Sequence, residues 1–257
     1  IAIPESVVEI RQSAFYGCKS IKQFRIPSGL SEISPHCFSM CSSLIQINLH
    51  ERLNKIGDGA FSGCSSLKQI IIPNSITVLS KQIFSNCSSL TKLKIPESIS
   101  LIDESAFYGC KSLKQLIIPS SVTRILSHAF ENCSSLKTIK LPSDLKEIPS
   151  FAFTNCKSIG QIEIPLSVTK IMSHAFEGCK SLRSINLSSS LNEIQSHAFQ
   201  NCKSLEQIEI PSTIISIEDS MFNGCSLLKQ ISIPSSVTKI GKEAFKKCES
   251  LTTFTIP

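Results

Sequence analysis

The sequence lacks tryptophan and has only two tyrosines, Tyr16 and Tyr108, among its 257 residues. Because these residue types are the usual anchors of tight protein interfaces, we expect any binding to be polar, weak at each site and strengthened by multivalency. No apolar run is long enough to cross a bilayer, so we expect no membrane insertion by this segment. Linkers and low-complexity stretches are also missing, and we therefore expect one domain over residues 1–257.

Recognisable catalytic motifs are missing as well. The chain has no His-Glu-x-x-His, no phosphate-cradling glycine loop and no nucleophile elbow, and its acids are scattered. We therefore predict that it is not an enzyme, with no catalytic residues, no metal and no cofactor. The net charge of +6 is modest, and the basic residues alternate with serine and glutamine instead of forming a run. This pattern argues against a nucleic-acid partner.

What the sequence does contain is a repeat of 23 residues that runs along the whole chain. Phenylalanine recurs three residues before each of the repeated cysteines, so two registers keep the same period. A period of this length is the signature of a solenoid, in which each unit buries its apolar stripe only by stacking on its neighbours. The repeated cysteines are Cys18, Cys41, Cys64, Cys87, Cys110, Cys133, Cys156, Cys179, Cys202, Cys225 and Cys248.

Each unit predicts a short strand followed by a helical turn. A Leu-x-x-Ile-x-Ile string, as in 113–118, has period-two alternation and precedes a proline, which is typical of a half-buried strand that ends there. Ile10, Ala14, Phe15 and Cys18 have the spacing of one helix face, and the glycine or asparagine before the cysteine suits a helix C-cap. We therefore predict an α/β repeat solenoid of about eleven coils, with parallel strands and short helical turns.

Both ends of the chain fall in the same repeat phase, and neither end has an atypical polar unit. Because solenoids need such capping units, we expect residues 1–257 to be a fragment of a longer protein.

The string Leu-x-x-Ile-x-Ile-Pro-x-Ser-Val-x-x-Ile-x-x-x-Ala-Phe-x-Gly-Cys resembles the BspA-type leucine-rich repeat over the whole chain. The resemblance implies a horseshoe with a parallel β-sheet on its concave side and helical turns on its convex side. It also implies a surface antigen or adhesin that binds protein or glycan ligands on host or microbial surfaces, and no catalytic residues. One fold hosts many binders, so this function rests on analogy.

The outward positions of the predicted strands are candidates for a binding face. One outward column is largely basic and the next is largely glutamine, while a third, which holds Ile71, Lys94 and Ile117, is irregular. Irregularity is expected of a recognition face and equally of an unconstrained surface; we favour recognition because the concave face is the largest contiguous surface. The predicted ligand-binding residues are Lys68, Gln69, Lys92, Lys94, Gln115, Lys137 and Lys140.

The spacing of the cysteines argues against a disulfide framework. Equivalent residues on adjacent coils would keep their Cβ atoms about 4.8 Å apart, beyond the usual disulfide range of about 3.5 to 4.5 Å. We expect a ladder of buried, reduced thiols, with Cys37 as one more core thiol in the position of Ala14. Free thiols favour the cytoplasm and an intracellular scaffold, whereas the resemblance favours a cell-surface or secreted protein. Burial protects thiols from oxidation, so we favour the surface.

Four of the five histidines share one repeat position, which predicts that His174 and His197 are stacked neighbours. A zinc site with Glu177 is one interpretation, and a solvent-facing position at a helix start is the other. We favour the second interpretation, because the number and geometry of ligands that a zinc site needs are lacking. The four are His36, His128, His174 and His197.

Overall fold

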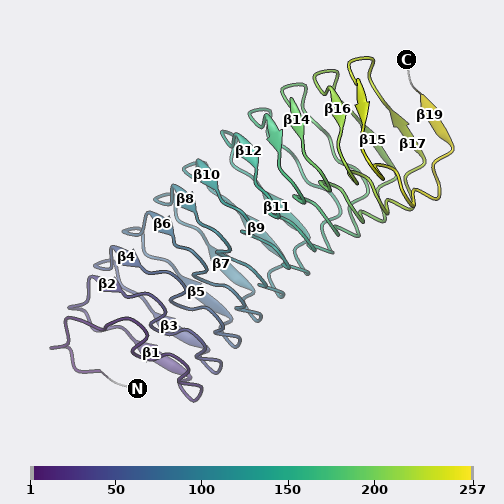
Figure 1. Cartoon of the computed structure of the whole chain (residues 1–257). Helices are drawn as coiled ribbons and strands as arrows, with labels where there is room; N and C mark the ends of the chain where they lie inside the picture. The colour runs from purple at the N-terminus through teal and green to yellow at the C-terminus, as the bar shows by residue number, and fades with distance from the viewer. Residues whose placement is uncertain (1–2, 256–257) are drawn as a thin grey trace.

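The computed structural model describes residues 3–255. The coils stack in sequence order from the N-terminus to the C-terminus as an elongated, twisting rod (Figure 1). Every strand pairing in the described chain joins residues one repeat apart, as in Gln23 with Gln46, so the predicted 23-residue coil is confirmed. Ile1 and Pro257, which begin and end the predicted repeat series, lie outside the described residues.

Most coils contribute a three-residue strand, the long strand, to one side of the stack, and two coils contribute only an isolated bridge there. The middle residue is buried and its two neighbours are exposed in β1, β3, β5, β9, β11, β15 and β17, as in Gln115, Leu116 and Ile117, which confirms the predicted alternation; Leu93 in β7 is partly buried. The long strands are β1 (Gln23–Arg25), β3 (Gln46–Asn48), β5 (Gln69–Ile71), β7 (Lys92–Lys94), β9 (Gln115–Ile117), β11 (Thr138–Lys140), β15 (Gln207–Glu209), β17 (Gln230–Ser232) and β19 (Thr253–Thr255). We name their outward surface, the face predicted to be concave, the long-strand face.

A second row of two-residue strands, the short strands, follows after the turn (Figure 1). Their second residue is buried and extends the same core, as Ile125 does, except in β18, where Ile240 is exposed. The short strands are β2 (Glu32–Ile33), β4 (Lys55–Ile56), β6 (Val78–Leu79), β8 (Leu101–Ile102), β10 (Arg124–Ile125), β12 (Glu147–Ile148), β13 (Lys170–Ile171), β14 (Glu193–Ile194), β16 (Ser216–Ile217) and β18 (Lys239–Ile240).

All strand pairs in the described chain are parallel, but neither row forms a continuous sheet. The long strands pair as β1-β3, β5-β7, β9-β11 and β15-β17-β19, with one isolated bridge between Glu163 and Asn186. The short strands pair as β2-β4, β6-β8-β10, β12-β13-β14 and β16-β18. The predicted parallel sheet is therefore present as short segments.

The predicted helical turns are wrong: residues 3–255 contain no helix. All residues with positive φ fall in two columns four residues apart, such as His128 (φ 62°) and Asn132 (φ 61°). The intervening N–H groups alternate between two acceptors, because Phe130 donates to Ala152 O of the next coil and Glu131 donates to His128 O. Half of these donors thus bond to the neighbouring coil, and an α-helix would need them within the segment.

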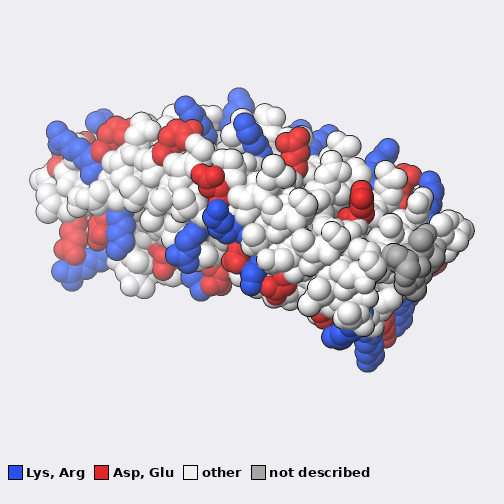
Figure 2. Space-filling model, turned by 90° about the horizontal axis from the view of Figure 1, so that it is seen from above, with Lys and Arg blue, Asp and Glu red and all other residues white. Residues whose placement is uncertain are grey.

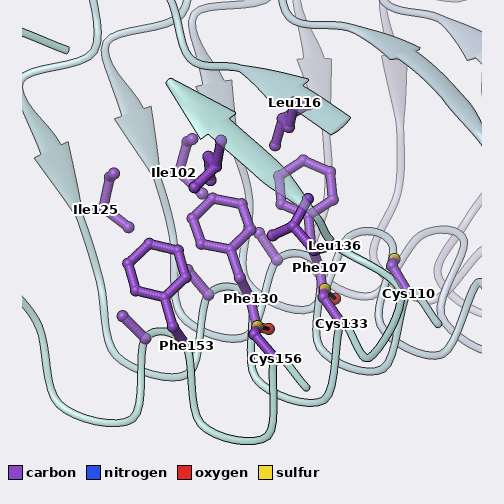
Figure 3. Packing of buried hydrophobic residues seen from close by; sticks show 14 of the residues in the cluster. Ile102, Phe107, Cys110, Leu116, Ile125, Phe130, Cys133, Leu136, Phe153 and Cys156 are labelled. Atoms are coloured by element: carbon purple, nitrogen blue, oxygen red, sulfur yellow. Dashed lines mark hydrogen bonds between the residues drawn. The ribbon is translucent and has the colours of Figure 1, made fainter. Parts of the chain in front are cut away.

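Phenylalanine forms a continuous ladder through the centre of the rod. Consecutive rings are nearly parallel, with centroids 5.5 Å apart between Phe107 and Phe130 and between Phe130 and Phe153. Figure 3 shows the rings of Phe107, Phe130 and Phe153 in a staggered row, with Ile102, Ile125 and the leucines packed around them. Offset-stacked rings at this separation stabilise one another beyond the contribution of buried area. Each coil therefore stabilises the next.

The cysteines form a second ladder beside the rings, as predicted. All twelve are free and ten are buried; Cys18 and Cys248 are partly buried. Each thiol from Cys41 onward in the repeated column donates to the phenylalanine carbonyl of the preceding coil, at 3.1 Å between Cys133 Sγ and Phe107 O (Figure 3). Cys37 is 1 % exposed, so it is the core thiol that its position predicts.

Candidate binding face

The structure brings the seven predicted ligand-binding residues together on the long-strand face of four consecutive coils. Lys68 precedes β5 and Gln69 begins it, while Lys92 and Lys94 are the ends of β7. Gln115 begins β9, Lys137 precedes β11 and Lys140 ends it. All seven are exposed. Five are outward positions of strands, and Lys68 and Lys137 directly precede their strands.

Strand pairing fixes which of these side chains are neighbours. Gln69 pairs with Lys92 and Ile71 pairs with Lys94 between β5 and β7. Between β9 and β11, Ile117 pairs with Lys140. Directly opposed residues on one sheet face have Cβ atoms about 4.5 to 5.5 Å apart, so each isoleucine lies beside a lysine.

Two further features were missing from the predicted set. Lys114 lies directly before β9, and its carbonyl accepts a hydrogen bond of 2.8 Å from the N–H of Lys137 in the next coil. Ile71 and Ile117 are 84 % and 70 % exposed. The basic and irregular sequence columns contain all three residues, so their repeat positions could have identified them. We define the basic-apolar patch as Lys68, Ile71, Lys92, Lys94, Lys114, Ile117, Lys137 and Lys140.

The six lysines of the patch have no ion-pair partner among residues 3–255. Some other lysines are paired with an acid of the neighbouring coil. Lys229 Nζ lies 2.9 Å from Glu206 Oε2 on the same face, and Lys170 Nζ lies 2.9 Å from Glu193 Oε2. The patch is therefore a local positive field that nearby acids leave largely uncompensated.

A depression of about 490 Å³ crosses the patch from β7 to β11. Its lining includes Lys94, Gln115, Ile117 and Lys140, with Glu97 as its acidic member. The depression spans the place where β7 and β9 are not hydrogen-bonded to each other. An interruption of the sheet thus lies beneath the patch.

Charge on the rest of the surface is mixed. Figure 2 shows basic and acidic side chains interspersed on the face seen from above Figure 1, with a wide uncharged area toward the C-terminal end. On the long-strand face itself, Glu163 and Glu209 replace the lysines of the patch farther along the chain. The positive field is thus confined to part of one face.

On the turns, the structure confirms that His174 and His197 stack, and it extends the stack to four rings. Ring centroids are 4.6 Å apart for His128 and Phe151, 4.5 Å for Phe151 and His174, and 4.4 Å for His174 and His197. His174 Nδ1 lies 2.7 Å from Glu177 Oε2, whereas the buried Nδ1 of His197 has no hydrogen-bond partner.

Metal binding at these rings finds no support in the geometry. Among residues 3–255, no group of three or more His, Cys, Asp or Glu side chains is arranged to hold a metal ion. Parallel stacked imidazoles direct their nitrogens side by side, and a tetrahedral metal needs ligands that converge on it. The ring stack instead packs neighbouring turns together. Over the same residues, no helix has the length and hydrophobicity needed to cross a membrane.

Comparison with protein families gives a match to a model described as "BspA type Leucine rich repeat region (6 copies)". The matched ranges are 1–114, 80–204 and 146–257, which together cover the chain. No curated protein sequence matches it.

Solved structures of bacterial leucine-rich-repeat proteins are similar to the chain. A leucine-rich repeat protein from Bacteroides ovatus is 31 % identical with a TM-score of 0.83, over 98 % of this chain and 70 % of that one. A leucine rich cell surface protein from Faecalibacterium prausnitzii is 33 % identical with a TM-score of 0.70, over 96 % and 70 %. The pneumococcal vaccine antigen PcpA, 24 % identical over 90 % and 60 % with a TM-score of 0.65, shares the fold.

Proposed function

Because the chain belongs to the BspA-type leucine-rich-repeat family, we propose that it is a non-enzymatic binding module of a cell-surface protein. We propose that the module binds a protein or glycan ligand on a host or microbial surface through the basic-apolar patch. Surface location is supported by the similarity to a leucine rich cell surface protein, and the fold of a vaccine antigen is similar.

The observation that carries the proposal is the clustering of six exposed lysines, without ion-pair partners among the described residues, at or directly before the long strands of four consecutive coils. Side chains at these outward positions do not contribute to the core, so their charge is not needed for packing. An uncompensated positive field on a rigid sheet accelerates association with acidic partners and favours them over basic ones. Strand pairing also holds the backbone of the patch in place, which lowers the entropy lost on binding.

The test uses the purified chain and a Lys92→Ser/Lys94→Ser/Lys140→Ser variant. Both are applied to immobilised matrix proteins, glycans and intact microbial cells, and bound protein is measured at about 0.05 M and about 0.5 M salt. We expect at least one surface to bind the chain in a salt-sensitive way, with at least about tenfold weaker binding by the variant.

The matched control is Lys229→Ser, which removes a lysine from the same face outside the patch. It should bind as the unchanged chain does. Equal binding by the triple variant, with melting temperatures unchanged, would place the binding site elsewhere.

A second candidate, an intracellular scaffold for protein-protein interaction, is favoured by one observation, the twelve free cysteines. Reduced thiols are typical of the cytoplasm. Antibody labelling of intact cells of the producing organism separates the two candidates. Signal on intact cells supports the surface module, and signal only after permeabilisation supports the scaffold.

A further inference from the structure

The basic-apolar patch alternates between apolar and basic side chains along the axis of the solenoid. Ile71, Lys94, Ile117 and Lys140 occupy the same outward position of β5, β7, β9 and β11. The two isoleucines are mostly exposed, and each is paired in register with a lysine that has no ion-pair partner among the described residues. The column therefore points to a partner with two kinds of side chain.

Resting on the function proposed above, we propose that this column is the docking surface for an acidic amphipathic α-helix of a partner protein. The helix lies along the solenoid axis, with apolar side chains over Ile71 and Ile117 and carboxylates over Lys94 and Lys140. Lys92, in the adjacent outward column, meets acids on the flank of the helix. The assignment depends on charge complementarity and on the spacing of the coils.

The spacing fits a helix better than an extended peptide. Ring centroids of successive coils beneath the patch are 5.9, 5.7 and 5.5 Å apart, and paired strands lie about 4.8 Å apart. Neighbouring side chains on one helix face are about 5 to 6 Å apart, whereas same-face residues of an extended chain are about 6.7 Å apart. A helix thus stays in register over four coils, while an extended chain drifts by about half a coil to one coil.

The apolar members of the column distinguish a protein helix from a polyanionic glycan. A sulfated glycan would use the lysines and leave Ile71 and Ile117 in water. An amphipathic helix would bury both isoleucines, and removal of apolar side chains from water favours binding. The depression between β7 and β11 lies along the same column and gives the helix a shallow seat.

The probe is a synthetic helical peptide of about twenty residues that carries leucine and glutamate alternately along one face at i, i+3/i+4 and i+7 positions. Control peptides are a scrambled peptide of the same composition and a peptide with lysine in place of glutamate. A sulfated glycan serves as the polyanion. Binding is measured by titration calorimetry against the unchanged chain.

Three protein variants complete the test. Lys94→Glu/Lys140→Glu should bind the glutamate peptide at least about tenfold more weakly than the unchanged chain does. The same variant should bind the lysine peptide, which the unchanged chain should not. Ile71→Ser/Ile117→Ser should bind the glutamate peptide at least about tenfold more weakly. The control is Leu166→Ser/Ile215→Ser, which removes exposed apolar residues elsewhere and should bind the peptide as the unchanged chain does. Melting temperatures check that each variant is folded.

The outcomes separate this inference from the proposed function. If the sulfated glycan binds, and Ile71→Ser/Ile117→Ser does not change the binding of the glutamate peptide, the proposal of a helical partner is wrong. A lack of peptide binding, with surface binding still lost in the Lys92→Ser/Lys94→Ser/Lys140→Ser variant, overturns the helix and leaves the proposed function in place. If neither peptide nor surface binds, both are overturned.

Discussion

The Sγ atom of Cys133 lies 3.1 Å from the carbonyl oxygen of Phe107, in the coil before it. The same contact recurs between Cys156 and Phe130 at 3.1 Å, so the two ladders of the core are joined by thiol hydrogen bonds. This contact explains why cysteine, and not another small apolar residue, recurs in the column. The thiol fills a small apolar space and also donates to a buried carbonyl.

Replacement of this thiol should therefore destabilise the fold. Cys133→Ala removes the hydrogen bond to Phe107 O and leaves a small cavity, and we expect a loss of about 1 to 2 kcal/mol in the free energy of unfolding. Urea denaturation measures the change. The matched control is Cys18→Ala in the first coil, where the thiol is partly buried and the loss should be smaller. Equal losses would show that the inter-coil contact is unimportant.

The buried thiols should also make stability depend on alkaline pH. Burial raises the pKa of the thiols of Cys87, Cys133 and Cys179 from 9.0 to about 12. Below about pH 9 the thiols are protonated in both states and stability is complete. Between about 9 and 12 the unfolded chain releases protons that the folded chain retains, so stability falls by up to about 1.4 kcal/mol per pH unit for each such cysteine.

Melting temperatures between pH 7 and pH 10.5 test this expectation, with Cys133→Ala as the variant that should show a shallower decline. Thiol titration provides a second measurement, since protonated buried thiols are inert. The folded protein at pH 8 should leave most of its twelve cysteines unreacted, and the denatured protein should react at all twelve. Rapid reaction in the folded state would contradict a protected ladder.

Gly109→Ala should destabilise the fold, chiefly through the backbone conformation at this position. Its φ is +69°, and a Cβ atom added there would lie 2.5 Å from Asn86 Oδ1 of the preceding coil. We expect Gly109→Ala to reduce the free energy of unfolding by about 1 to 2 kcal/mol, chiefly from left-handed backbone strain, because the Asn86 amide is the end of a flexible side chain and can move away at lower cost. Gly160→Ala is the control, because it has no atom within 4 Å of the added Cβ.

A second substitution separates the two causes. Asn86→Gly removes the amide that the added Cβ would meet. In that background Gly109→Ala should lower the free energy of unfolding by less, because only the backbone strain remains. If the loss of stability in the double variant equals the sum of the losses in the two single variants, the clash is absent.

The ring stack on the turns should stabilise the fold at Phe151. Its ring lies between His128 and His174, at 4.6 and 4.5 Å between centroids. Phe151→Ser removes both contacts and introduces the residue found at Ser105 and Ser220, which share its repeat position and its positive φ. We expect a loss of about 1 to 3 kcal/mol, since each aromatic contact contributes about 0.5 to 1.5 kcal/mol.

Combining Phe151→Ser with His174→Ala should cost less than the sum of the two single changes, because they share one contact. Urea denaturation again gives the free energies. Additive losses would show that the rings merely lie near one another.

The sequence by itself determined the order of the coils, the inward direction of residues such as Leu116 and Phe130, and the protected thiol ladder. It did so because a 23-residue period and a period-two alternation are local properties that every copy of the unit repeats. It also predicted that five of the six lysines of the basic-apolar patch share one face, since residues one period apart must lie side by side on neighbouring coils.

Only the tertiary structure decided the conformation of the turns, the break between β7 and β9 and the absence of ion pairs around Lys94. The spacing of Ala14, Phe15 and Cys18 fits a helix face equally well, and the choice depends on whether N–H donors bond within the segment or to the next coil. That choice depends on the neighbouring coil, whose carbonyl accepts the N–H of Phe130, and local spacing does not encode it.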